Sequence, residues 1–272
     1  NATSRAIGVL LPSLTNHVFA DVLRGIETIT DAAGYQTLVA HFGYDAQKEE
    51  RQLRSLLGWN IDGVILTERT HTPATLRMLE IAGIPVVEIM DSASPCLDMA
   101  VGFDNVEAGR QMTEMLIRRG HRSAVYLGAR LDERTLQKQQ GYELAMCEAG
   151  LEPMSIMVEM SSSFTTGAVL LQQALQRFPH MDSLCCTNDD LAVGAMFECQ
   201  RQGIAVPQQI AIMGFHGHDI TRVVTPALAT VVTPRQQIGE EAAGMLLQRL
   251  KGVMVSEKVR DLGFSIDCGG SI

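Results

Sequence analysis

Long apolar runs are missing from this chain. No stretch approaches the ~18–20 consecutive apolar residues of a membrane-spanning helix, and the longest runs, such as residues 61–67, have the length of a strand. The opening NATSRAIGVLL lacks the charged start and long apolar core of a secretory signal. The sequence therefore predicts no membrane partner and no leader. Because it starts at Asn1 rather than at a methionine, we expect a fragment whose upstream part is missing.

Enzyme signatures are missing too. The first apolar segment is followed by PSLTNHVF, without the glycines that let a dinucleotide approach the backbone. There is no Gly-x-x-x-x-Gly-Lys-Ser/Thr phosphate loop and no Gly-x-Ser-x-Gly nucleophile turn. We therefore predict no catalytic residues, no cofactor and no enzyme activity.

Metal and disulfide patterns are also scarce. The six cysteines form no Cys-x-x-Cys pair, so we expect free thiols in a reducing compartment. His216 and His218 alternate in MGFHGHDI, but no His-x-x-x-His or cysteine pair supports them as zinc ligands. The sequence predicts no metal site, and this segment is interpreted as a ligand-contacting loop, with an ordinary polar loop as the alternative.

The remaining composition is that of a folded protein. Hydrophobic residues make up 46% and charged residues 19% of the 272 residues, which suits one large domain or two lobes with sizeable cores. The net charge of −9 argues against nucleic acid binding by this stretch itself, because phosphate contacts need clustered lysine and arginine.

Strand-length apolar segments alternate with helix-length amphipathic segments along the chain. Strands are predicted at residues 6–12, 36–42, 61–67, 84–90, 100–104, 123–128, 183–187, 209–215, 227–232 and 259–267. Helices are predicted at residues 19–35, 45–57, 72–83, 105–120, 132–150, 165–178, 188–203 and 235–252. Such alternation predicts an α/β fold with parallel sheets covered on both faces. About ten units exceed one comfortable sheet, so we expect two similar lobes.

Ligands of such folds bind outside the carboxyl ends of the strands. Polar and charged residues gather at these predicted ends, in segments 12–19, 67–69, 128–138, 187–190, 215–219 and 233–235 and at Asp91 and Asp104. The histidine pair lies in one of these segments. We therefore expect a ligand site at these strand ends.

A set of segments in consistent order resembles the effector domain of the LacI/GalR family of transcription regulators, which shares its fold with periplasmic sugar-binding proteins. The set is IGVLLPSLTNHVFADVLRGIE, IDGVILT, IPVVEIMD, VGFDNVEAG, RRGHRSAVYLG, CTNDDLAVGAM, IAIMGFHGHD and TPALATVVTP. More narrowly, LTERTHTP, YLGARLDERT, GFHGHDI and GGSI resemble family members that repress gluconate utilisation. The same segments resemble members that respond to idonate or ketogluconate almost as closely.

The resemblance implies two Rossmann-like lobes of the periplasmic-binding-protein type I fold, with three crossovers and a ligand cleft between them. We place the N-terminal lobe at residues 1–104 and 235–261 and the C-terminal lobe at 105–234 and 262–272. The resemblance further implies a cytoplasmic homodimer and an upstream helix-turn-helix domain, absent from this chain, that binds operator DNA. The predicted function is the effector-binding and dimerisation domain of a repressor that responds to gluconate or a similar sugar acid.

The resemblance also assigns ligand contacts, each with a structural alternative. Asn188 matches a residue that touches a sugar hydroxyl, or it only caps a helix. Asp91 matches a ligand-facing position, or it is a turn residue. Phe19 borders the pocket or packs in the core, and Ser13 on the same loop is placed to donate to a hydroxyl. Asp104, at a strand end, is a further candidate.

Departures from the family pattern favour an acidic ligand. Lys138 stands where many members have arginine, and Arg134 one turn earlier shares its helix face, with a solvated surface as the alternative. His216 replaces an aspartate, and an imidazole is compatible with an anion. Ser162 replaces an aromatic that stacks on sugar rings, a small loss for an open-chain ligand. Arg235 is a weaker cationic candidate, since it could also begin a helix at the surface.

Two other functions stay open at this point. A periplasmic sugar-acid receptor would have the same fold, but six cysteines without a pairing pattern argue against export. A sugar-acid enzyme would need a nucleophile, metal set or cofactor loop, and the sequence offers none.

Overall fold

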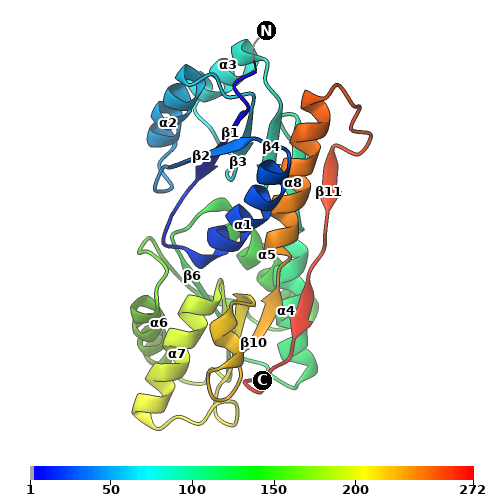
Figure 1. Ribbon diagram of the computed structural model, residues 1–272. Coiled ribbons are helices and arrows are strands. Elements are labelled where there is room, and N and C mark those ends of the chain that lie inside the picture. Colours follow the sequence, from blue (N-terminus) through cyan, green and yellow to red (C-terminus); the bar gives the residue numbers. More distant parts are fainter. Residues whose placement is uncertain (1–2) are drawn as a thin grey trace. The chain divides into compact units, whose positions relative to one another are not determined.

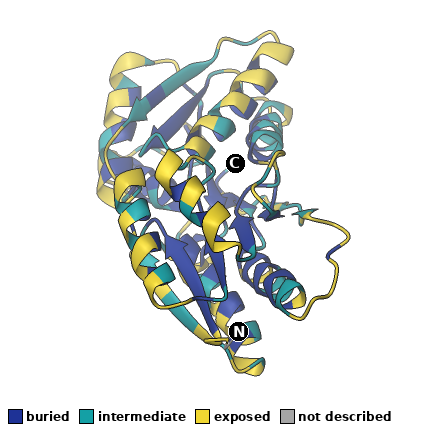
Figure 2. Cartoon of the chain, turned by 90° about the horizontal axis from the view of Figure 1, so that it is seen from above, coloured by how far each residue is buried: buried dark blue, intermediate teal, exposed yellow. Residues whose placement is uncertain are grey.

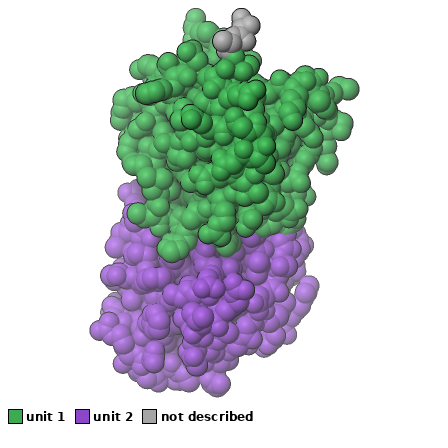
Figure 3. Space-filling model, in the orientation of Figure 1, with its two compact units in different colours: residues 1–104, 234–263 green, residues 105–233, 264–272 purple. Residues whose placement is uncertain are grey.

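The computed structural model describes residues 3–272; residues 1 and 2, where the sequence analysis places the start of a fragment, lie outside that range. The chain divides into unit 1 (Asn1–Asp104 and Pro234–Gly263) and unit 2 (Asn105–Thr233 and Phe264–Ile272), coloured separately in Figure 3. Pro234 and residues 262–263 belong to unit 1, whereas the sequence analysis assigned them to the C-terminal lobe. Leu262 contacts unit 1 through its backbone N–H, which donates to the carbonyl oxygen of Gly102.

Unit 1 contains a parallel sheet in the order β11-β5-β4-β3-β1-β2. The strands are β1 (Ala6–Leu11), β2 (Gln36–His41), β3 (Gly63–Leu66), β4 (Val86–Ile89), β5 (Met99–Gly102) and β11 (Val259–Asp261). The helices, visible in Figure 1, are α1 (His17–Ala32), α2 (Ala46–Gly58), α3 (Pro73–Ala82) and α8 (Arg235–Leu250). Strands β1, β3, β4 and β5 are buried along their whole length, whereas the edge strand β2 is not. Figure 2 shows buried strands in dark blue and helices with exposed outer faces in yellow. Helices on both faces account for this burial.

Unit 2 repeats the arrangement in the order β12-β10-β9-β8-β6-β7. Its strands are β6 (Ala124–Ala129), β7 (Met154–Val158), β8 (Ser183–Cys186), β9 (Ala211–His216), β10 (Ala229–Val232) and β12 (Ser265–Asp267). Its helices are α4 (Asn105–Arg118), α5 (Glu133–Glu148), α6 (Phe164–Arg177), α7 (Asp189–Gln202) and the 3₁₀ turn η1 (Asp219–Arg222). Only the β10–β12 pair is antiparallel among the described strand pairs of this sheet.

Both sheets have a defined switch point. In each unit the first strand lies between the second and the third, namely β1 between β2 and β3 and β6 between β7 and β8. This is the doubly wound order in which the chain reverses its direction of winding, and ligands bind outside the carboxyl ends of the strands at that reversal. The strand order thus marks the loops after β1 and β3, and those after β6 and β8.

The predicted alternation is confirmed, with one strand missed. Strand β7 was not predicted, because MSIMV is a short edge strand of mostly half-buried residues that follows Pro153. The segment 259–267, where a crossing between the lobes is expected near residue 262, forms two short strands: β11 joins the sheet of unit 1 and β12 joins that of unit 2. Between them Gly263 has a φ of +69°, a left-handed conformation that interrupts an extended segment and favours glycine.

Glycines bring helix pairs close together in both units. A Cβ atom at Gly141 of α5 would lie 1.9 Å from the Val106 carbonyl oxygen of α4, and one at Gly109 would lie 2.2 Å from the Lys138 carbonyl oxygen. The missing side chains let α4 and α5 pack backbone against backbone. This contact sets the position of α5, which carries Lys138.

Candidate functional site

Lys138 lies at the switch point of unit 2. Helix α5 begins after β6, and Asp132 caps it by accepting from the Thr135 backbone N–H at 2.8 Å. Lys138 is buried, and its Nζ donates to the carbonyl oxygen of Thr187, at the end of β8, at 3.1 Å. The ammonium group therefore lies between the carboxyl ends of β6 and β8.

Phe215 connects Lys138 with His216. The Lys138 Nζ lies 3.8 Å from the centroid of the Phe215 ring, a cation–π contact. The His216 ring meets the same phenyl ring nearly edge-on, with centroids 5.0 Å apart. The structure thus brings these two predicted site residues to one aromatic side chain.

The backbone of His216 is unusual. Its φ is +106°, in a region that non-glycine residues rarely adopt and that is costly without surrounding support. Its Nδ1 lies 3.0 Å from the Thr233 hydroxyl, and the Thr233 N–H donates to the His216 carbonyl oxygen at 3.2 Å. These contacts with the end of β10 fix the ring at the carboxyl edge of the sheet.

Asn188 and Ser162 also meet at this edge. The Asn188 side chain accepts from the Leu191 N–H at 3.1 Å and caps α7, while its amide nitrogen donates to the Ser162 hydroxyl. The capping role that the sequence analysis left open is therefore present in the structure. A contact between Asn188 and the ligand stays a prediction.

The charged groups around Lys138 oppose one another. Burial lowers the pKa of Lys138 to about 7; Arg134 acts in the same direction, and Asp132 and Asp189 act against it. For Asp132 burial acts to raise the pKa, but the charge of Arg134 and the Thr135 N–H outweigh it, and the net pKa is lowered. Half-buried Arg134 thus stabilises the helix cap and disfavours a charge on Lys138. A bound anion would stabilise the charged form of both cations.

Asp189 has a structural role in the GFHGHD segment. Its carboxylate accepts from the His218 N–H at 2.8 Å and from the Thr230 hydroxyl at 2.7 Å. A Cβ at Gly214 would lie 2.4 Å from this carboxylate, so only glycine leaves room for it. Across residues 3–272 no group of three or more His, Cys, Asp or Glu side chains is placed to hold a metal ion. The histidine segment is a loop fastened to α7 and β10.

In unit 1, Ser13 and Phe19 follow β1. The half-buried Ser13 hydroxyl accepts from the Asn16 N–H at 3.1 Å and from the Thr15 N–H at 3.2 Å, which orders the loop before α1. Phe19, in the first turn of α1, is 2% exposed. Its burial favours core packing over an exposed aromatic wall.

Asp91 follows β4 in a tightly held segment. The preceding Met90 is buried with a φ of +72°, and a Cβ at Gly102 of β5 would lie 2.2 Å from the Asp91 nitrogen. The Asp91 side chain accepts from the Ala93 N–H at 2.8 Å, which is the turn role considered from the sequence. Asp104, between β5 and α4, is exposed.

Arg235 differs from the surface residue that the sequence analysis considered. Its side chain is 9% exposed, and its Nη2 lies 3.0 Å from the Asp21 carboxylate on α1. The pairing of α1 with α8 explains the burial, because a Cβ at Gly25 would lie 2.1 Å from the Gln236 carbonyl oxygen. Arg235 thus has a carboxylate partner within unit 1.

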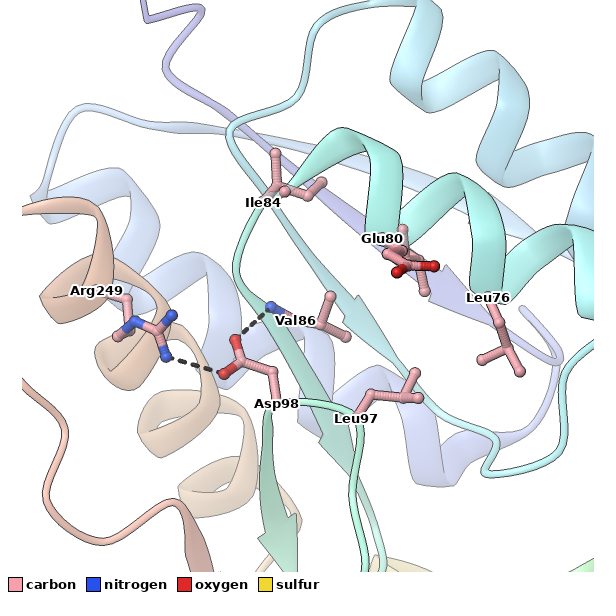
Figure 4. A pocket seen from close by; sticks show the side chains of 9 residues that line it. Leu76, Glu80, Ile84, Val86, Leu97, Asp98 and Arg249 are labelled. Carbon is pink, nitrogen blue, oxygen red and sulfur yellow. Dashed lines mark hydrogen bonds and ion pairs between the residues drawn. The ribbon is translucent and has the colours of Figure 1, made fainter.

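A separate pocket of about 450 Å³ opens on unit 1 between α3, the start of β4 and α8. Leu76, Ile84 and Leu97 supply apolar walls (Figure 4), and Asp98 accepts from both Arg249 and the Val86 N–H. Val86 begins β4 whereas Asp91 follows it, so the pocket lies at the amino end of this strand and the predicted site residue Asp91 lies at its carboxyl end. It is not part of the candidate effector site.

Several residues at the site were not singled out from the sequence. Thr187, Phe215 and Thr233 contact Lys138 or His216, and Arg69 holds the Asp91 segment. All four residues lie in the strand-end segments where a ligand site is expected from the sequence. Only the strand order could show which of these segments are neighbours.

The fold is that of the effector domain of a transcription regulator, and the chain belongs to the LacI family. Residues 4–262 match the family described as periplasmic binding proteins and sugar binding domain of LacI family. No described helix is both long enough and apolar enough to cross a membrane.

Individual relatives are regulators as well. The chain is 64% identical over its full length to the HTH-type transcriptional regulator GntR of Escherichia coli (strain K12), of which it covers 82%. It is 44% identical to the HTH-type transcriptional regulator IdnR of the same strain, again over 100% of this chain and 82% of the relative. The crystal structure of transcription regulator GntR from Chromobacterium violaceum superimposes with a TM-score of 0.95 at 41% identity, covering 98% of both chains. These matches confirm the predicted fold and the regulator function and argue against the enzyme and receptor alternatives.

Proposed function

We propose that this effector domain binds gluconate or a similar open-chain sugar acid. The observation that carries the proposal is the buried Lys138 ammonium at the switch point of unit 2, with His216 beside it on the same phenyl ring. A buried amine without a carboxylate in hydrogen-bonding contact is costly, and an anionic ligand would offset that cost.

The polar groups near Lys138 suit the rest of such a ligand. Asn188, Ser162 and His216 can each donate to or accept from hydroxyl groups, and we propose them as contacts along the polyol chain. We also propose Asp91 and Ser13, which follow strands of the unit 1 sheet, as ligand contacts. The resemblance of LTERTHTP and GFHGHDI to gluconate regulators supports the same ligand class, with idonate or ketogluconate as the alternative.

Calorimetry tests the proposal with a matched pair of ligands. Gluconate and D-glucitol share one carbon chain and differ in a single terminal carboxylate. We expect gluconate to bind roughly 10- to 150-fold more tightly than glucitol, the range for a hydrogen bond to a charged group of about 1.5–3 kcal/mol. Glucose should give no measurable heat. Equal affinities for gluconate and glucitol would contradict an acid-specific site.

We further propose that binding modulates operator recognition in the cytoplasm. The curated relatives are HTH-type transcriptional regulators, and this chain covers 82% of their length. A helix-turn-helix domain would then occupy sequence that these relatives have in addition. The acidic net charge of −9 agrees with DNA contacts lying outside this chain.

We also propose that the domain is a homodimer, with α6 and α7 contributing. Phe164 and Phe197 are 46% and 48% exposed, and large exposed apolar groups often mark interfaces. We expect sedimentation velocity to show a species of twice the 29.6 kDa chain mass, and Phe197→Glu to shift it toward the monomer. A monomer at every concentration of wild-type protein would contradict the proposal.

A further inference from the structure

Four charged side chains form a buried cluster in unit 1. His71 and Glu49 are each 1% exposed at the side chain, Glu88 is 2% exposed, and Arg69 is 12% exposed. They come from the loop between β3 and α3, from the first turn of α2, and from β4. Two cations and two carboxylates balance, as buried charges require. None of the four residues is among the predicted effector contacts.

The cluster forms a chain of contacts. His71 Nδ1 lies 2.5 Å from a Glu49 carboxylate oxygen, and His71 Nε2 lies 3.7 Å from Glu88 Oε1. The other Glu88 oxygen lies 3.7 Å from Arg69 Nη1 and accepts from the Leu97 N–H at 2.9 Å. Glu88 therefore stands between His71 and Arg69.

Arg69 extends this chain to the predicted site. Its Nη2 donates to the Asp91 carbonyl oxygen at 2.8 Å, and its Nη1 donates to the Pro95 carbonyl oxygen at 3.0 Å. The guanidinium fork thus holds two points of the loop that begins at Asp91. Lysine, with a single nitrogen, does not offer this fixed two-point geometry.

The segment needs such support because its backbone is unfavourable. Met90 has a φ of +72°, and non-glycine residues remain in this region only when their surroundings constrain them. Contacts on three sides constrain the segment: Arg69 at the carbonyl groups, Ala93 at the Asp91 carboxylate, and Gly102 at the backbone. Of these three contacts, the one from Arg69 comes from a side chain that is paired with another charged group, Glu88.

Burial acts to lower the pKa of His71, but the hydrogen bond to Glu49 and the negative charges of Glu49 and Glu88 outweigh it and raise the pKa to about 9. His71 is therefore a cation at neutral pH. Its positive charge balances the negative charge of Glu49. It also attracts Glu88, whose other carboxylate oxygen faces Arg69.

We propose that Arg69 and His71 are positioning residues for effector binding: His71 orients Glu88, Glu88 orients Arg69, and Arg69 fixes the segment that carries Asp91. This inference rests on the proposed function, because Asp91 is a proposed ligand contact. It assigns a role to the LTERTHTP segment without placing its side chains on the ligand.

Three variants test the order of contacts. Arg69→Lys keeps the charge and removes the fork. His71→Asn keeps an amide nitrogen near the Nδ1 position, facing Glu49, and His71→Gln keeps one near the Nε2 position, facing Glu88. Both His71 variants remove the positive charge, so their loss of thermal stability should be similar. His121→Gln, at a half-buried histidine of unit 2, is the control.

Each variant is characterised by two measurements. Amide hydrogen exchange is measured across residues 91–97 of the ligand-free protein, and gluconate affinity is measured by calorimetry. We expect Arg69→Lys and His71→Asn to speed exchange and to weaken binding about tenfold, while His71→Gln, whose amide still faces Glu88, has a clearly smaller effect on both. Equal behaviour of the two His71 variants would overturn the route through Glu88, even if Arg69→Lys does not fold. If wild-type protein binds no gluconate, the proposed function fails, and the exchange data still decide whether the cluster positions the Asp91 segment.

Discussion

Replacing Lys138 by methionine should weaken gluconate binding roughly 10- to 150-fold, the equivalent of losing about 1.5–3 kcal/mol for a hydrogen bond to a charged group. Methionine matches the length of the lysine stem and keeps the contact with Phe215 apolar. The loss therefore reports on the ammonium group. Glucitol affinity should change little, because glucitol has no carboxylate to lose.

The same variant should change the pH dependence of binding. Because burial lowers the pKa of Lys138 to about 7, the free protein loses this charge as the pH rises through neutrality. An anion binds the charged form, so wild-type affinity should fall between pH 6 and pH 9, by at most about tenfold per pH unit for one linked proton. Lys138→Met should lack this dependence. Calorimetry at several pH values measures it.

The stability of the fold should change with pH in the opposite sense to gluconate affinity. The pKa of Lys138 lies below its ordinary value of 10.5, so burying the charged amine destabilises the fold below pH 7, and the penalty is relieved as the pH rises toward 10.5. His71, with a raised pKa of about 9, stabilises the fold most below its ordinary pKa of 6.5 and loses that contribution as the pH rises through 9. His71 is present in both proteins and cancels from the comparison. Lys138→Met should therefore exceed wild type in melting temperature most clearly near pH 6.

Lys251→Met is the control for Lys138→Met, because Lys251 is an exposed residue just beyond α8. It should leave gluconate affinity and its pH profile unchanged. If Lys138→Met binds gluconate as wild type does, Lys138 is a structural lysine that donates to the Thr187 carbonyl oxygen, and the acid must be held elsewhere.

The alternation of apolar and amphipathic segments was sufficient to predict two lobes with parallel sheets covered by helices, since each buried strand leaves an unbroken apolar run. The Rossmann-like winding of the lobes was implied by the family resemblance. Strand ends followed from the same pattern, and Lys138 and His216 stood out there as departures from the family pattern. What periodicity cannot give is strand order. The contact of Lys138 with Thr187 depends on β6 and β8 being neighbours, although the two residues lie 49 positions apart.

Side chains whose partners are distant in sequence were the least predictable. Arg235 looked like a possible surface cation, but its partner Asp21 lies 214 positions away. Glu49 and Glu50 follow the cap of α2 and resemble ordinary acidic residues of a first helical turn. One is nevertheless buried against His71, and the other accepts from Thr72. A single charged residue in a sequence does not show whether a partner of opposite charge reaches it.

Replacing Gly141 by alanine should destabilise the protein by about 3 kcal/mol, at the upper end of overpacking costs. The new methyl group would lie 1.9 Å from the Val106 carbonyl oxygen and 2.6 Å from the Arg110 nitrogen. Both are backbone atoms of α4, so no side chain can turn away and the two helices must separate. Since Lys138 precedes Gly141 by one turn of α5, this shift should also move the ammonium away from Thr187 and weaken gluconate binding.

Thermal and urea denaturation measure the effect, which should lower the melting temperature by roughly 6–12 °C for a domain of this size. Gly244→Ala is the matched control, because Gly244 lies within α8 and a Cβ there meets nothing within 4 Å. Alanine at that position should stabilise the helix by about 0.5–1 kcal/mol. If Gly141→Ala is as stable as Gly244→Ala, α4 and α5 are not packed backbone against backbone, and the position of Lys138 at the strand ends must have another cause.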